Sequence, residues 1–194
     1  MLPIETVAVV GANEAGTTCA VLAALAGCSV RVFDPSDRAL ERAFEIVRRR
    51  VELAYSAGVI TRTERQRVLD GVLFTPDLEE ALTGADLAVD AGPPGVVDLP
   101  ARLAAALRAT AVIAAAGGSA AAELAARLPQ PTRVLALELA ETAGPVPRLE
   151  ILPAPATSPH VLERAHAFAA SVNRAWRLTT PPDPPLRSVE RGEI

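Results

Sequence analysis

Short apolar runs alternate along the chain with longer segments whose apolar residues recur at helical spacing. Residues 7–10 form such a run and end at a glycine, and an alanine-rich stretch from residue 14 to 26 follows them. Residues 29–33 are the next run of β-branched residues. A strand, a helix and a second strand within about thirty residues form a right-handed βαβ unit, which predicts two parallel strands in one sheet.

The same alternation continues to the end of the chain. A helix with Ser36 as its N-cap is expected up to residue 57, and Thr61 with Glu64 three residues later predicts a second helix that starts with a capping box. Further strands are predicted at residues 72–74, 85–91, 111–115, 133–139, 148–152 and 175–178, and further helices at 77–82, 99–107, 120–128 and 158–171. The pattern predicts an α/β fold of the Rossmann type. In it, a doubly wound, mainly parallel sheet carries helices on both faces and a helical-pair insertion.

The turn after the first strand carries a candidate binding motif. Residues 11–16 read G-A-N-E-A-G, which is the G-x-G-x-x-G dinucleotide fingerprint with asparagine at the middle glycine. Gly11 would permit the sharp turn, and Gly16 would let the helix approach the strand, while the helix N-terminus offers N–H groups to a pyrophosphate. Asn13 adds a side chain where the phosphates approach, and Glu14 adds a negative charge that repels them.

An acidic residue stands where the fingerprint requires one. Asp34 ends the second strand, 18 residues after Gly16, where a carboxylate accepts hydrogen bonds from the adenosine ribose and repels a 2′-phosphate. We therefore expect the cofactor to be NAD rather than NADP. The alternative is a Rossmann fold whose nucleotide site has decayed, because Asn13 and Glu14 both depart from the motif.

Composition narrows the classes of function. All 19 basic side chains are arginine, which excludes Schiff-base chemistry and a lysine general base, and the net charge of −4 without a basic patch argues against nucleic acid. No apolar run reaches the roughly 18 residues that span a bilayer, and no secretory pattern is visible, so we expect no membrane association and a cytoplasmic location. Cys19 and Cys28 have no neighbouring Cys or His at metal-ligand spacing, so no metal site is expected.

Two stretches of sequence carry a resemblance to a known family. Residues 58–64 match the pattern G-x-[LI]-T-x-x-E of a helical pair, and residues 75–81 match the pattern T-x-D-L-E-x-A that follows it. Together with residues 85–91 and 145–151, these two stretches resemble the NAD-binding N-terminal domain of the 3-hydroxyacyl-CoA dehydrogenases. The resemblance covers roughly residues 5–178. In that family the helical pair contributes to CoA binding, so the resemblance implies an acyl-CoA as a further ligand.

The resemblance also assigns catalytic positions, and most of them differ here. Family members use a histidine in an H-F-F-N-P motif with a glutamate twelve residues later as the general base. Glu150 matches that glutamate, and Glu138 stands in place of the histidine. Glu141 replaces the asparagine of the motif, and the substrate-contacting serine falls at Gly117 or Gly118. Glu138 and Glu150 are thus the candidate catalytic residues that remain.

Three functions fit these observations. The leading hypothesis is a 3-hydroxyacyl-CoA dehydrogenase-like protein that binds NAD or a related nucleotide and is catalytically degenerate. The second is an active NAD-dependent oxidoreductase on a 3-hydroxyacyl-CoA or related hydroxy acid, with Glu138 and Glu150, or a partner subunit, as the base. The third is a non-enzymatic scaffold subunit.

The expected organisation of the chain follows from the same resemblance. Residues 1–179 are predicted to form the dinucleotide-binding domain, and residues 180–194, which hold four prolines, a Pro-rich tail. The sequence shows no counterpart of the family's C-terminal helical domain. Alanine-rich helices with shallow surfaces favour a homodimer.

Overall fold

A computed structural model describes residues 3–92, 99–140 and 148–179, without the side chains of residues 118–119 and 174–179. The predicted Pro-rich tail at residues 180–194 and the family position at Glu141 lie outside the described residues. None of the described helices is both long and apolar enough to cross a membrane.

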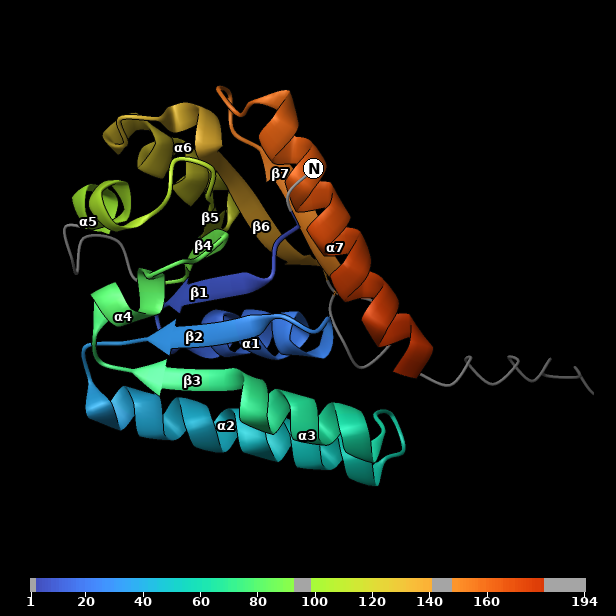
Figure 1. Cartoon of the computed structure of the whole chain (residues 1–194). Helices are drawn as coiled ribbons and strands as arrows, with labels where there is room; N and C mark the ends of the chain where they lie inside the picture. The colour runs from blue at the N-terminus through green and yellow to red at the C-terminus, as the bar shows by residue number, and fades with distance from the viewer. Residues whose placement is uncertain (1–2, 93–98, 141–147, 180–194) are drawn as a thin grey trace, which may run out of the picture.

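The described strands form one twisted sheet (Figure 1). Its seven strands are β1 (Thr6–Val10), β2 (Ser29–Phe33), β3 (Val72–Thr75), β4 (Leu87–Asp90), β5 (Val112–Ala116), β6 (Val134–Ala140) and β7 (Arg148–Pro153). They lie in the order β3-β2-β1-β4-β5-β6-β7, and all neighbours are parallel except β6 and β7. The predicted α/β class and mainly parallel sheet are therefore confirmed.

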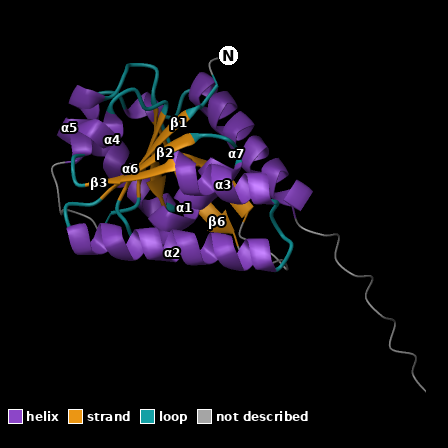
Figure 2. Ribbon diagram, turned by 60° about the horizontal axis from the view of Figure 1, so that its bottom comes forward, coloured by secondary structure: helices purple, strands orange, loops and turns teal. Residues whose placement is uncertain are grey.

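Helices cover both faces of the sheet, as Figure 2 shows. On one face, α1 (Glu14–Leu25), α2 (Asp37–Ser56), α3 (Arg62–Gly71) and α7 (Pro159–Thr179) pack over Val7, Val9 and their neighbours. On the other face, α4 (Leu78–Leu82), α5 (Leu99–Ala106) and α6 (Gly118–Arg127) pack over Ala8, Ile113 and their neighbours. A single 3-10 turn, η1 (Pro131–Arg133), leads into β6. Two apolar cores result, one on each side of the sheet, as in a doubly wound fold.

Local signals in the sequence set the helix ends. The Ser36 side chain accepts a hydrogen bond from the Ala39 N–H at the start of α2, at 3.3 Å. Thr61 and Glu64 form the predicted capping box at the start of α3. Gly27, at φ +95°, takes the left-handed conformation that ends α1, because glycine carries no Cβ to strain there.

The predicted helical pair is present between β2 and β3. Arg65 of α3 donates from Nε to both carboxylate oxygens of Glu52 on α2, at 3.0 Å each, and its guanidinium lies 5.7 Å from the Tyr55 ring centroid. These contacts hold α2 and α3 against each other. Phe44 of α2 is 47% exposed and packs edge-on against Phe74 of β3.

One predicted strand is wrong. Residues 175–178 belong to α7, which continues eight residues beyond its predicted end at Ser171. The side chain of Asn173, on this part of the helix, bonds both the N–H and the carbonyl oxygen of Leu149, at 3.0 Å each. A further strand would have had to pair with the outer edge of β7. At Leu149 the side chain of Asn173 takes up the backbone groups that such a strand would need.

Candidate functional site

The strand order defines where a ligand would bind. From β1 the chain proceeds outward through β2 and β3 on one side, and from β4 through β5 and β6 on the other. In such sheets ligands bind beyond the carboxyl ends of the strands where the order reverses, which here lies between β1 and β4. The turn after β1 and the residues after β4 therefore frame the candidate site.

Two glycines allow these segments to come together. Gly11 has φ +109°, and a Cβ on it would lie 2.8 Å from the Gly92 nitrogen, so only glycine fits between the two turns. A Cβ on Gly16 would lie 2.0 Å from the Gly11 carbonyl oxygen. The first turn of α1 therefore packs directly on the end of β1, the close approach that the sequence predicts.

Asn13 has a different conformation from the one its place in the motif suggests. Its φ of −86° is ordinary for any residue, and its side chain folds back as the N-cap of α1. The Oδ1 atom accepts a hydrogen bond from the Gly16 N–H at 2.9 Å, and Nδ2 donates to the Ala91 carbonyl oxygen. The side chain thus joins the turn after β1 to the turn after β4, and at the end of the helix it occupies the Gly16 N–H.

The helix end keeps donors for an anion. No described residue accepts a hydrogen bond from the backbone N–H groups of Asn13, Glu14 or Ala15. Asp34, just after β2, accepts hydrogen bonds from the Ala12 N–H at 3.1 Å and the Ser36 N–H at 3.0 Å, one to each oxygen. A carboxylate has about four lone-pair positions, so Asp34 can also accept from ribose hydroxyls. Three backbone donors and one oriented acid thus fit the diphosphate and the ribose of a dinucleotide.

The Glu14 carboxylate is paired. Its side chain is 90% exposed, and its Oε1 lies 3.3 Å from Nη2 of Arg50 on α2. The structure therefore places Gly11 and Asn13 in the turn after β1 and Glu14 and Gly16 in the first turn of α1. Asp34, the fifth predicted nucleotide residue, bonds the Ala12 N–H of the same turn.

Asp90 is a residue that the sequence interpretation did not assign to the site. It ends β4, opposite Val10 of β1 and Ala115 of β5, at the point where the strand order reverses. Burial raises the pKa of its carboxyl group above the usual value, although the Gly92 N–H, which donates at 3.1 Å, acts in the opposite sense. The sequence carries a signal for Asp90, because it is an acid at the end of an apolar strand, and the same signal identified Asp34.

Glu138 and Glu150 lie directly opposite each other on β6 and β7. Because the N–H and carbonyl of Leu149 point outward to Asn173, the neighbouring Glu138–Glu150 pair is of the hydrogen-bonded kind, with Cα atoms about 5.5 Å apart. Both side chains are half-buried. The proposed catalytic residues are therefore brought together, on the face that carries α4, α5 and α6.

Arg148 binds the carboxylate of Glu150. Its Nη2 and Nε atoms donate to Oε1 of Glu150 at 2.7 and 3.2 Å. Two strands, β4 and β5, separate β1 from β6, so none of the described contacts joins Glu138 or Glu150 to the glycine turn. The predicted site thus consists of two separate groups along the sheet.

The two thiols have no evident part in chemistry. Burial raises the pKa of Cys19 to about 12 and that of Cys28 to about 11, where nearby Asp86 and Glu5 add to the effect. Thiols of this kind carry little thiolate at neutral pH and are unreactive.

Fold and turn together define a dinucleotide-binding α/β domain, and comparison with known proteins assigns it to a family. The model of the 3-hydroxyacyl-CoA dehydrogenase NAD-binding domain matches residues 6–176. The chain therefore belongs to this family, whose domain binds NAD.

Curated relatives share part of the chain. A 3-hydroxybutyryl-CoA dehydrogenase of Mycobacterium tuberculosis is 36% identical over 88 residues, which are 45% of this chain and 30% of that protein. A 3-hydroxyadipyl-CoA dehydrogenase of Escherichia coli is 33% identical over 91 residues, which are 47% of this chain and 19% of that protein. These matches cover less than a third of either relative.

Solved structures match nearly all of this chain. The crystal structure of M. tuberculosis FadB2 superposes with a TM-score of 0.81 and 30% identity, over 89% of this chain and 62% of the other. The 3-hydroxybutyryl-CoA dehydrogenase of E. coli gives a TM-score of 0.80 and 28% identity, over 88% of this chain and 37% of the other. The chain thus spans less than two thirds of the length of both.

Proposed function

We propose that this chain binds NAD(H) through the turn between β1 and α1 and is catalytically degenerate with respect to 3-hydroxyacyl-CoA dehydrogenation. The observation that carries the binding proposal is the geometry of this turn. Gly11 and Gly16 permit its close packing, no described residue accepts from the three backbone N–H groups at residues 13–15, and Asp34 is held beside it. Asp34 favours NAD over NADP because a 2′-phosphate would meet its negative charge.

The second part of the proposal, that the chain is catalytically degenerate, rests on the strand pair β6–β7. NAD supplies the hydride acceptor in this family, and the protein must remove the proton of the 3-hydroxyl group. A histidine suits that step because its ordinary pKa lies near neutrality. Here Glu138 takes the histidine position, and the carboxylate opposite it is bound to Arg148. General-base catalysis contributes about 10²- to 10⁴-fold, so we expect its loss to reduce turnover by at least that factor.

Calorimetric titration of the purified chain tests the binding proposal. NAD and NADH are expected to bind, and NADP is expected to bind more weakly. A chain that binds none of the three would contradict the proposal and favour the scaffold function. The same preparation, incubated with NADH and acetoacetyl-CoA, is expected to oxidise little or no NADH.

An active oxidoreductase is the second candidate, and one observation favours it. Glu138 and Glu150 are direct cross-strand partners on one face of the sheet, so both side chains are placed to act on the same substrate. Glu138→Gln and Glu150→Gln would each abolish the activity of such an enzyme. Neither change would matter to a protein that only binds NAD.

Three further features remain proposals. The helical pair α2–α3 is proposed to contact an acyl-CoA, and the chain is proposed to form a homodimer. Residues 1–179 are proposed to act as one dinucleotide-binding unit. Titration with acetoacetyl-CoA and sedimentation of the purified chain test the first two directly.

A further inference from the structure

Arg50 is held at the first turn of α1 by two contacts. Its Nη1 atom donates to Oγ1 of Thr18 at 2.6 Å, and its Nη2 atom lies 3.3 Å from Oε1 of Glu14. The Thr18 hydroxyl in turn donates to the Glu14 carbonyl oxygen at 2.7 Å. The guanidinium is therefore fixed by a residue one helical turn into α1, and its own side chain is 35% exposed against 90% for that of Glu14.

Glu14 creates an electrostatic conflict at this position. Its backbone N–H is one of the three donors of the proposed phosphate site that no described residue occupies, while its side chain carries a negative charge at the same end of the helix. An acidic residue in the first turn stabilises the helix through the dipole. The same charge repels a diphosphate that approaches the same N–H groups.

We propose that Arg50 is a positioning residue for dinucleotide binding, which draws the Glu14 carboxylate away from the phosphate site and offsets its charge. This inference rests on the proposed NAD-binding function. Because Thr18 anchors the guanidinium independently, Arg50 stays in place when Glu14 moves. The fixed cation thus lets an acidic residue remain in the first turn of a helix that accepts a diphosphate.

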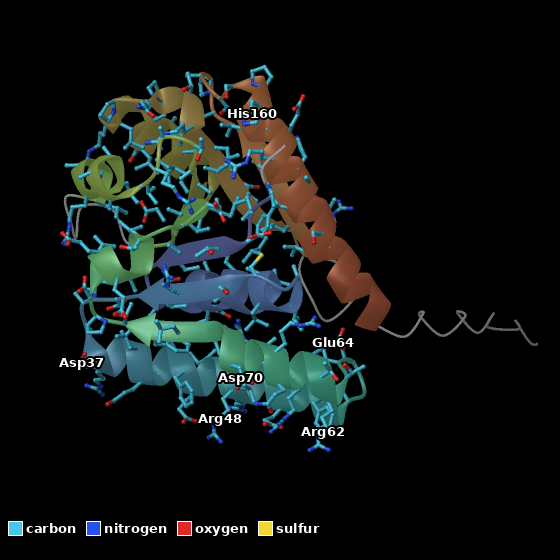
Figure 3. The ribbon with its side chains drawn as sticks, viewed as in Figure 1. Asp37, Arg48, Arg62, Glu64, Asp70 and His160 are labelled. Carbon is cyan, nitrogen blue, oxygen red and sulfur yellow. The ribbon has the colours of Figure 1, made fainter. Side chains whose placement is uncertain are left out.

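The neighbouring arginine provides a matched control. Arg48 carries the same charge two residues earlier on α2, but it pairs with Glu45 of its own helix at 2.6 Å. Figure 3 shows Arg48 on the outer side of α2, away from the sheet. Removing either arginine changes the net charge equally, so a difference between the two variants reports on the contacts of Arg50 at its own position.

A double-mutant cycle on the full chain tests the proposal. NAD is titrated by calorimetry at low ionic strength into the unaltered protein, Arg50→Gln, Glu14→Gln and the double variant. Arg50→Gln is expected to weaken NAD binding by about two- to fivefold, the size of a single charge effect at a helix N-terminus. In the Glu14→Gln background, the same change is expected to have no more effect than Arg48→Gln.

Three outcomes would overturn the proposal. Equal losses from Arg50→Gln in both backgrounds would mean that Arg50 acts on the phosphates without Glu14. Equal effects of Arg50→Gln and Arg48→Gln on NAD affinity would mean that Arg50 acts only through the net charge of the protein. A matching loss of adenosine binding, which involves no phosphate, would show a structural defect instead. If NAD fails to bind the unaltered protein, the proposed function itself fails, and that result is distinct from all three.

Discussion

The turn between β1 and α1 keeps most of the residues that the family pattern predicts there, whereas the strand pair β6–β7 departs from that pattern. In the turn, Gly11 and Gly16 occupy positions where a Cβ would meet backbone atoms, and Asp34 is bonded to the same turn. In the strand pair, Glu138 stands where the resemblance predicts a histidine, and its partner Glu150 is bound to an arginine. Backbone packing constrains the first region, whereas the side chains of the second can change without disturbing the sheet.

Under the proposed function, this difference explains how the binding geometry persists while the catalytic residues are replaced. A glycine in the turn is required by the fold itself, because the first turn of α1 packs on β1 through it. Glu138 and Glu150 are half-buried on neighbouring strands, where the backbone hydrogen bonds of the ladder do not depend on the identity of the side chains.

The largest effect is expected for Gly16→Ala. A Cβ there would lie 2.0 Å from the Gly11 carbonyl oxygen, so the helix or the strand must move. We expect a loss of unfolding free energy near the upper end of the about 1–3 kcal/mol that overpacking costs, together with loss of NAD binding. Gly71→Ala is the control, since its Cβ would have only the Cys28 carbonyl oxygen within reach, at 3.8 Å. Equal urea midpoints for the two variants would refute the close packing.

Asp34→Ala is expected to have the next largest effect. Loss of a charged acceptor for the ribose should weaken NAD binding by about tenfold or more, while NADP loses a repulsive charge, so the difference between the two narrows. Calorimetric titration with both cofactors measures this. Asp37→Asn, an exposed acid at the start of α2, is the control and should leave both affinities unchanged. Identical NAD and NADP affinities in the unaltered protein would remove Asp34 from the site.

Asn13→Ala is expected to cost about 1 kcal/mol of unfolding free energy, because the variant loses the N-cap of α1. Asn13→Gly should cost only a few tenths of a kcal/mol, since glycine is tolerated at an N-cap. Urea denaturation of the unaltered protein and the two variants provides the comparison. If Asn13→Ala is as stable as the unaltered protein, the capping interaction with Gly16 contributes nothing measurable.

The smallest effect concerns Asp90 and pH. The pKa of Asp90 is raised in the folded protein, so the folded state holds its proton more tightly than the unfolded state. The cost of ionising Asp90 in the folded protein therefore grows as pH rises from the ordinary pKa of aspartate to the higher folded pKa, and it remains above that. Asp90→Asn should stabilise the protein at pH 7 and lose this advantage at acid pH below the ordinary pKa of aspartate. A gain that is independent of pH would contradict the burial effect.

The parts of the structure that depend on local sequence could be predicted. The capping box at Thr61, the left-handed Gly27 and the fingerprint with Asp34 all follow from residues a few positions or one βαβ unit apart. The strand predicted at residues 175–178 was wrong because periodicity in a short apolar run does not distinguish the end of a helix from a strand.

Contacts between distant segments could not be predicted. The Asn13 side chain bonds Ala91, 78 residues away, and Arg50 bonds Glu14 across two helices. Asn13 was expected to obstruct the phosphates, because the motif alone does not reveal that its amide has partners elsewhere. Such side-chain contacts depend on how the elements pack and leave no periodic signal in the sequence.

The central claim is that the chain binds NADH but lacks the family's dehydrogenase activity. Its most direct test follows NADH oxidation with acetoacetyl-CoA, at NADH concentrations that calorimetry has shown to saturate the protein. We expect saturable NADH binding and no oxidation above the rate without protein. Rapid oxidation by the unaltered chain, abolished by Glu138→Gln or Glu150→Gln, would contradict the claim and identify the carboxylate pair as catalytic.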